Sequence, residues 1–492
     1  MDFLANTGLS VTDLGVIVFY LLLCVFVGIK AGGKPTDTTA YFKTDGNVPW
    51  WAVSFSIVAT ETSLLTVLSI PAVAYLGSMV FLQIVLGYII GRFLVAYLIL
   101  PSYFRGEQKT AYTFFKERFG SQYQRLISGV FLVTRLLADG VRLFAAAIPI
   151  QVVTGLGYPV SIAIIAVLTL AYTYYGGLKS VIWIDVLQFV VYTIGGIYVI
   201  IYVSNNIVEP LWPMLADAGK FTFIDWPDTF SAVFSNPYNF IGALIGGTFL
   251  SMASHGTDHL MVQRLLACNQ LRDAQKALIF SGFFVFAQFA LFLMVGMYIF
   301  GFYGGISIDQ LGVNRADDIL IKFSTEELNY GMGGLIIAGL FAAAMSTLSS
   351  SLSALSSSTL FDIFPKLAAK DNAMSLSRRL MVVWTGVFFV FAASFTSADN
   401  PVIEIGLAIA GFTYGGLLGS FLVGRYTQYQ VQDAVAGLIC CVALMVTLIN
   451  LTDIAYPWFT LIGVLIYFAA STVSHFLRRF INKNKEDHKE EV

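Results

Sequence analysis

Residues 50–75 read WWAVSFSIVATETSLLTVLSIPAVAY, a stretch long enough to cross a membrane that carries a polar run at its centre. Glu61 lies between Thr60 and Thr62, and Pro71 follows later in the same stretch. A carboxylate is costly in lipid, proline removes a backbone donor, and hydroxyl side chains compete for backbone hydrogen bonds. We therefore predict a helix that is unwound near Glu61, where backbone carbonyls coordinate a cation. A proline-kinked helix whose Glu61 pairs with a neighbouring helix is the alternative.

The rest of the chain has the composition of a membrane protein. Of its 492 residues, 57% are hydrophobic and 12% are charged, and the mean hydropathy is +0.77. Soluble domains carry about 25% charged residues, so a cytosolic enzyme, a disordered chain and a nucleic-acid-binding protein are excluded. The apolar segments have helical length, and roughly ten-residue alternating segments typical of a membrane barrel are absent. We predict an all-α polytopic protein of the cell membrane with about 13 transmembrane helices.

The basic residues divide the predicted loops into two sets. Loops on one side hold 22 of the 28 Lys and Arg residues. Because positive residues favour the cytoplasmic side, we place the N-terminus outside and the C-terminus inside. No span is followed by a soluble domain, so we expect the function to lie within the lipid bilayer, and no obligate protein partner is evident.

A second polar segment lies in GLIIAGLFAAAMSTLSSSLSALSSSTLFDIF, residues 334–364. Ten of the fourteen residues from Ser346 to Thr359 are Ser or Thr. At about 100° per residue, one helix face carries five of them: Ser346, Ser349, Ser350, Ser353 and Ser357. Hydroxyl oxygens are hard ligands that suit an alkali cation, so the stripe predicts an ion site. Close helix packing through small residues is the alternative.

Further ionisable side chains lie within apolar spans. Arg135, Asp139 and Arg142 share one helix face, where one arginine neutralises Asp139 and leaves the other to bind a substrate carboxylate. A closed structural triad is the alternative. Asp185 lies near a predicted membrane edge, where it also suits a helix N-terminus. Arg92 is alone in its span, and we expect it to make a structural ion pair.

His255, Asp258 and His259 have a spacing that resembles a metal site. Gly256 loosens the helix there, however, and no further ligand lies nearby in the sequence. A Gly-interrupted span is also typical of a discontinuous transporter helix. An intramembrane metal-dependent enzyme using these three residues is therefore an alternative function rather than the favoured one.

The polar interruptions of the second and seventh spans lie five spans apart, which predicts two inverted five-helix repeats. We divide one transmembrane transporter domain, 1–492, accordingly. A leading helix occupies 1–48, the first repeat 49–204 and the second repeat 238–424. Two trailing helices occupy 425–476, and a charged cytoplasmic tail occupies 477–492.

Four segments together resemble the sodium/solute symporter family: VPWWAVSFSIVATETS, YGGLKSVIWIDVLQ, VQRLLACNQLRDAQKA and AAAMSTLSSSLSALSSSTLFDIF. The stretch IVATETS…LTVLSIPA is most similar to the branch that transports sialic acid and related solutes. The resemblance implies the inverted-repeat (LeuT-like) fold and a transporter without enzymatic activity. It further implies symport of sodium with a small polar organic solute, a sialic acid or a related sugar or carboxylate, by alternating access. Sodium is then the coupling ion, and no other cofactor is needed. Proton coupling through Glu61 or Asp185 is the alternative, which the hydroxyl cluster disfavours.

The resemblance also implies specific oxygen ligands. The first sodium site takes backbone carbonyls and hydroxyls from five residues: Ala59, Thr62, Ala343, Ser346 and Thr347. Some members hold a second sodium, for which the matching residues here are Asp185, Ser346, Ser349 and Ser350.

Substrate contacts implied by the resemblance include Ser63 and Thr66. Arg142 matches the carboxylate-binding arginine of sialic-acid transporters, with Arg135 as its competitor. Asp258 stands where sugar-transporting relatives have an amide. Glu61 departs from the small or amide residue common there, and it could recruit a cation, pair with Arg142 or recognise a basic substrate.

Overall fold

The structure, a computed structural model, describes residues 9–490 except 34, 45–47, 107, 208–209, 314, 329–330 and 395–401. Within these ranges the chain forms helices and no strand, as predicted. Eight helical stretches among the described residues are long and apolar enough to cross a membrane, and a bent pair forms a ninth. The eight are α2 (Val11–Gly32), Met79–Tyr103 around α6 (Leu82–Leu94), α10 (Tyr158–Asn206), α15 (Leu271–Phe302), α17 (Met332–Ser358) with its extension to Ile363, α19 (Ala373–Ser394), α21 (Val431–Leu451) and α22 (Trp458–Glu490).

α9 (Ser121–Thr154) is also long, but three charged residues at its centre lower its apolar character. α20 (Val402–Tyr426) packs against α9. The remaining helices are α3 (Thr38–Lys43), α4 (Trp50–Glu61), α5 (Leu64–Leu76), α7 (Leu100–Tyr103), α8 (Thr113–Phe119), α11 (Leu211–Asp217), α12 (Phe230–Ser235), α13 (Phe240–Gly256), α14 (His259–Leu265), α16 (Ile319–Glu326) and α18 (Pro365–Ala368).

Two spans predicted from the sequence are broken, and two others are joined across a kink. α4 and α5 form the bent pair, at an angle of 68°. α13 and α14 are separated at Thr257 and Asp258, next to Gly256. The 49-residue α10 is interrupted at Gly177, whose φ of 57° is rare for any other residue type, so two predicted spans meet there.

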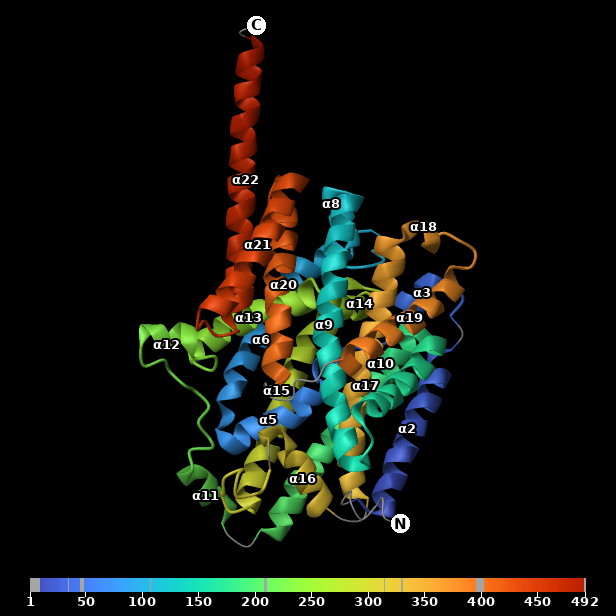
Figure 1. Ribbon diagram of the computed structural model, residues 1–492, viewed down its shortest axis with the longest axis vertical. Helices are drawn as coiled ribbons and strands as arrows, with labels where there is room; N and C mark the ends of the chain where they lie inside the picture. The colour runs from blue at the N-terminus through green and yellow to red at the C-terminus, as the bar shows by residue number, and fades with distance from the viewer. Residues whose placement is uncertain are drawn as a thin grey trace.

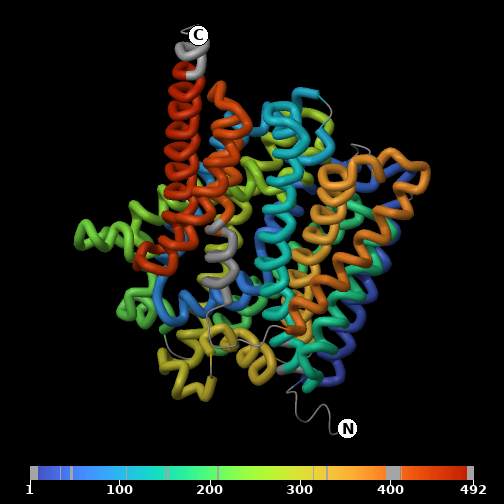
Figure 2. Tube along the Cα trace, turned by 45° about the horizontal axis from the view of Figure 1, so that its top comes forward, coloured from blue at the N-terminus to red at the C-terminus, as the bar shows by residue number. Residues whose placement is uncertain are grey.

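α17 lies at the centre of the bundle. It packs against α2, α9, α10 and α19, and nearly all of its residues are buried. Figure 2 shows it between α9 and α19, with α2 and α10 along one flank and α21 and α22 along the other. A helix so rich in hydroxyls is better satisfied inside the protein than against lipid, which explains its central place.

The two ends of the molecule differ in the segments that they carry. α11 and α16 lie at the end where α2 begins, whereas α8 and α18 lie at the end from which α22 emerges (Figure 1). These are the loops that the charge distribution assigns to the outside and to the cytoplasm, respectively.

Candidate functional site

The helix break lies in the polar centre of the second apolar segment. α4 ends at Glu61, and α5 begins at Leu64. The Ser63 amide donates to the Glu61 carbonyl at 3.0 Å, where a continuous helix would pair it with Ala59. No described group donates to the carbonyl oxygens of Ala59 or Thr62. The chain therefore has two backbone oxygens available to a cation, as an unwound helix predicts.

The hydroxyl stripe of α17 faces this break. Thr60 Oγ1 lies 3.2 Å from Ser350 Oγ. Thr347 and Ser63 line the same small hollow, and Thr347 Oγ1 donates to the Ala343 carbonyl at 3.2 Å. The predicted first sodium ligands thus come from two facing elements, the break and α17.

The predicted second sodium site contains a guanidinium group. Asp185 is fully buried and accepts from Ser56 Oγ at 2.5 Å and from Ser346 Oγ at 2.6 Å. Arg264 is also fully buried, donates to Asp185 Oδ2 at 3.2 Å and contacts Ser350 Oγ. The positive charge opposite this carboxylate is therefore already supplied by the protein.

Arg264 was not among the predicted site residues, because it lies at the end of a predicted span, where basic residues are typical of a cytoplasmic loop. It belongs to the segment VQRLLACNQLRDAQKA, one of the four on which the family resemblance rests. Ser349, the remaining predicted ligand, donates to the Ser346 carbonyl at 3.0 Å. Its hydroxyl proton thus points along α17.

The two arginines of α9 have different surroundings. Arg135 Nε donates to Asp258 Oδ2 at 2.9 Å, and Arg135 Nη2 contacts the same carboxylate. Arg135 Nη2 also donates to the Tyr414 hydroxyl. Arg142 pairs with Asp139 at 2.8 Å. The Arg142 side chain keeps 24% of its surface exposed, against 6% for Arg135. Arg142 is the more accessible guanidinium.

Glu61 is ion-paired with Arg92, which is buried in α6. His255 Nε2 lies 3.6 Å from the same Glu61 oxygen and 3.1 Å from Arg92 Nη2. The expectation that Arg92 makes a structural pair is confirmed. The helix is broken near Glu61 and Glu61 also pairs with a neighbouring helix, whereas cation coordination at the break stays a prediction.

The His255, Asp258 and His259 side chains turn to different partners. Asp258 binds Arg135, and His259 Nε2 lies 2.8 Å from Ser357 Oγ. Among the described residues, no group of three or more His, Cys, Asp or Glu could hold a metal ion. The metal-enzyme alternative therefore lacks a site in this part of the chain.

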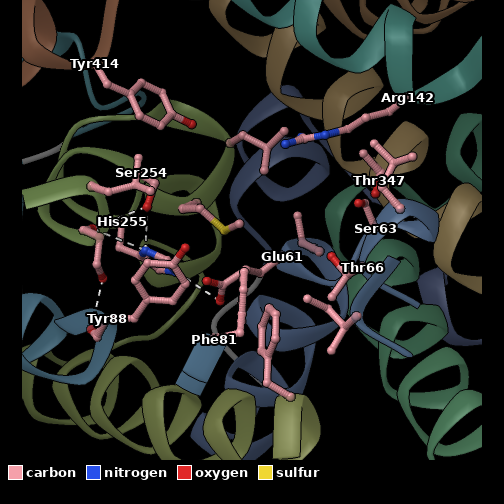
Figure 3. A pocket seen from close by; sticks show the side chains of 18 of the residues that line it. Glu61, Ser63, Thr66, Phe81, Tyr88, Arg142, Ser254, His255, Thr347 and Tyr414 are labelled. Carbon is pink, nitrogen blue, oxygen red and sulfur yellow. Dashed lines mark hydrogen bonds and ion pairs between the residues drawn. The ribbon is translucent and has the colours of Figure 1, made fainter. Parts of the chain in front are cut away.

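A cavity of about 160 Å³ lies between the break, α9, α13 and α17 (Figure 3). Six of the predicted site residues line it: Glu61, Ser63, Thr66, Arg135, Arg142 and Thr347. Asp258 is not on its wall, because Arg135 and Tyr414 cover that carboxylate. Aromatic residues complete the wall and were missed, since their sequence pattern does not differ from that of lipid-facing ones: Phe81, Tyr88, Tyr238, Phe289 and Tyr414.

The far end of α5 is held by a lysine from the loop that contains α11. Lys220 is buried and donates to the carbonyls of Ala74 at 3.2 Å and Tyr75 at 2.6 Å. Its ammonium lies 3.9 Å from the centre of the Phe300 ring. Burial lowers the pKa of Lys220 to about 8.

Comparison with known proteins agrees with this arrangement. Residues 41–440 match the sodium:solute symporter family. The chain belongs to this family. It is therefore a multi-pass membrane protein that couples solute transport to sodium, and it is a transporter rather than an enzyme.

Individual relatives cover most of the chain. A sodium/sialic acid symporter of Proteus mirabilis (strain HI4320) is 26% identical over 476 residues, which are 92% of this chain and 93% of that protein. A putative sodium-dependent multivitamin transporter of Drosophila melanogaster is 27% identical over 451 residues, 88% of this chain and 74% of its own.

A solved structure supports the same fold. The substrate-bound, outward-open state of a Na+-coupled sialic acid symporter superposes with a TM-score of 0.82 and 23% identity, covering 95% of this chain and 98% of that one. A nucleobase-cation symporter in a closed conformation gives a TM-score of 0.55 at 14% identity, with 90% and 95% covered.

Proposed function

We propose that this symporter imports a small organic monocarboxylate, a sialic acid or a related acidic solute, and that Arg142 binds the carboxylate. The observation that carries the proposal is the partly exposed Arg142 guanidinium on the cavity, in the same hollow as Ser63 and Thr347. Arginine recognises carboxylates through paired charge-assisted hydrogen bonds. Arg135 suits this role less well, because Asp258 and Tyr414 already occupy it.

The names of the relatives support an anionic solute. They include sialic acid symporters, a sodium/iodide cotransporter of Homo sapiens and sodium-coupled monocarboxylate transporter 2 of Mus musculus. All of these named solutes are anions, which a guanidinium on the cavity wall would attract. A solute that carries a carboxylate fits both the relatives and the site.

The coupling sodium, we propose, binds between the break and α17. Its ligands are the carbonyls of Ala59, Thr62 and Ala343 and the hydroxyls of Ser346 and Thr347. The two unpaired carbonyls support this site. Because Thr347 also lines the cavity, a sodium ion here would order the wall against which the solute binds.

Asp185, Ser346, Ser349 and Ser350 form the candidate second site. Arg264 occupies the charge-balancing position there, so we propose that Arg264 replaces the second sodium in this conformation. The transport cycle would then use one sodium per solute.

We further propose a topology of thirteen spans, with the N-terminus outside, the C-terminus inside, and two inverted repeats at 49–204 and 238–424. The breaks at α4–α5 and α13–α14 support the repeats, because they fall at corresponding places. Sodium and solute enter from the side of α11 and α16 and leave toward α8 and α18.

The energetics follow from this direction. One sodium moving inward gains about 2.3 kcal/mol per 100 mV of membrane potential, but a monocarboxylate anion moving with it loses the same amount, so the sodium concentration gradient drives this cycle. Reciprocal linkage requires sodium to raise solute affinity by the same factor as solute raises sodium affinity.

Reconstituted vesicles test the proposal. Purified protein in liposomes is given an inward sodium gradient, and uptake of labelled sialic acid, lactate and glucose is compared with uptake in a choline gradient. We expect sodium-driven uptake of an acid, and Arg142→Gln should weaken it strongly at low solute concentration. Uptake of glucose alone, or acid uptake unaffected by that substitution, would reject the carboxylate assignment.

A further inference from the structure

We infer that Glu61 accepts a hydrogen bond from a second polar group of the substrate. The transporter would then select monocarboxylates that carry a neutral hydroxyl or N–H donor away from the carboxylate. The inference rests on the proposed function, since it takes Arg142 as the carboxylate site. It starts from two charged side chains on the cavity wall with appreciable exposure: Arg142 is 24% exposed and Glu61 is 17% exposed.

The two side chains approach the cavity from different sides. Figure 3 shows Arg142 next to Thr347 and Ser63, whereas Glu61 lies beside His255. Arg142 comes from α9, and Glu61 is the last residue of α4. A bound solute that spans the cavity would therefore meet a cationic donor at one end and an acceptor at the other.

One oxygen of Glu61 is available to the solute. Arg92 pairs with Oε2, and His255 Nε2 lies 3.6 Å from the same oxygen. No described group contacts Oε1, which belongs to a residue on the cavity wall. Arg92 thus fixes the carboxylate in place and leaves its second oxygen, on a residue of the cavity wall, as an available hydrogen-bond acceptor.

The charges behind Glu61 decide which donor fits. A guanidinium only donates, so His255 Nε2, 3.1 Å from Arg92 Nη2, must accept. His255 Nδ1 then carries the proton, with Ser254 Oγ at 2.8 Å and the Ser251 carbonyl at 3.3 Å as its partners. His255 is neutral, and Glu61 with Arg92 forms a neutral pair.

A neutral pair favours a neutral donor. A hydroxyl, amide or ureido N–H satisfies Glu61 Oε1 without adding a charge to the cavity. An ammonium group would have to lose its hydration beside a carboxylate whose charge Arg92 already compensates. The free energy of desolvation would then exceed the Coulombic gain.

The aromatic wall near Glu61 indicates which kind of solute body fits between the two charged side chains. The Phe81 and Phe289 rings stack with centroids 5.2 Å apart, and the Tyr238 ring lies 5.8 Å from Phe81. Such a wall suits an apolar or flat body. The substrate class is then a carboxylate, an apolar body and a distal hydroxyl or N–H group.

Matched ligands test the inference on the full-length protein. Sodium-dependent binding is measured by thermal shift for omega-hydroxy and omega-ureido alkanoates from butanoate to octanoate, each against the plain alkanoate of equal length. We expect the wild type to bind the donor-bearing member of at least one pair about tenfold more tightly, because the plain member leaves a buried acceptor unpaired.

The deciding variant is the double substitution Glu61→Leu with Arg92→Met. It removes both charges together and leaves no unpaired buried ion, so we expect the variant to fold, which its thermal unfolding in choline checks. We expect its preference within each pair to fall to about one. Glu326→Gln is the matched control, since Glu326 is an exposed carboxylate paired with Lys322, and it should keep the wild-type preference.

The outcomes separate this inference from the proposed function. Equal binding of both members in the wild type, or a preference that survives the double substitution, overturns the role of Glu61. Sodium-dependent binding of the plain alkanoates would then still uphold the carboxylate site. Absence of sodium-dependent binding for every carboxylate overturns both.

Discussion

The two candidate cation sites beside α17 share the same hydroxyl-rich helix but differ in what faces it. At the α4–α5 break, the carbonyls of Ala59 and Thr62 accept no hydrogen bond from the described residues, and no cationic side chain reaches them. At Asp185, the guanidinium of Arg264 is already paired with the carboxylate. A set of hard oxygens is therefore insufficient to define a sodium site, because the protein can supply the cation itself.

The largest effect is expected from Arg264→Met, which leaves the buried Asp185 carboxylate without its partner. Breaking one side of a buried ion pair destabilises by about 3–5 kcal/mol. Thermal unfolding in choline should show this loss.

Sodium sharpens the same prediction. In the Arg264→Met variant Asp185, Ser346 and Ser350 become an unoccupied oxygen cluster, so sodium should restore part of the stability and restore it more than in the wild type. Asp185→Asn together with Arg264→Met is the control that should remove this extra sodium response. A variant as stable as the wild type in choline would contradict the pairing.

Arg142→Gln is expected to raise the KM for an acidic solute by about ten- to a hundredfold, the worth of a charge-assisted hydrogen bond. Sodium binding in the absence of solute should change little, because Arg142 is not among the sodium ligands. Uptake kinetics in vesicles measure the first quantity, and a sodium titration of thermal stability measures the second. An equal loss in both would place Arg142 in the sodium site.

Thr347→Ala removes one hydroxyl from the site at the break. We expect the sodium concentration for half-maximal uptake to rise about tenfold, a loss of about 1.4 kcal/mol. Ser353→Ala is a matched control on the same helix, since the buried Ser353 hydroxyl has no partner among the described residues. An unchanged sodium dependence in Thr347→Ala would move the site elsewhere.

The smallest effect concerns Lys220, which lies away from both sites. Burial lowers its pKa from 10.5 to about 8, so between these values the unfolded chain binds a proton that the folded chain does not. The free energy of unfolding should therefore rise with pH in this window. Lys220→Met should lack that rise when melting is compared at pH values on either side of about 8; an identical pH profile would show that Lys220 does not titrate there.

Much of this arrangement could be predicted from the sequence, because lipid makes every polar residue in an apolar span informative. The run at Thr60–Ser63 predicted the break, and Gly256 predicted the second interruption. The hydroxyl stripe predicted an ion site on α17, which stays a prediction. In each case the signal lies within one helix.

The pairings between helices could not be predicted in the same way. Arg264 meets Asp185 from 79 positions away, and Arg92 meets Glu61 from 31 positions away. Hydropathy can place an arginine at the end of a span, but it does not show whether a carboxylate on another helix lies close enough to pair with it. Asp258 was predicted to contact the substrate, but it pairs with Arg135 and does not line the cavity.

Counting bound sodium ions tests the difference between the two sites most directly. Equilibrium binding of radioactive sodium to the purified protein should saturate at one ion per chain, be weakened by Thr347→Ala and be unaffected by Ser353→Ala. Two ions per chain in the wild type would contradict the assignment, since Arg264 would then not replace the second sodium.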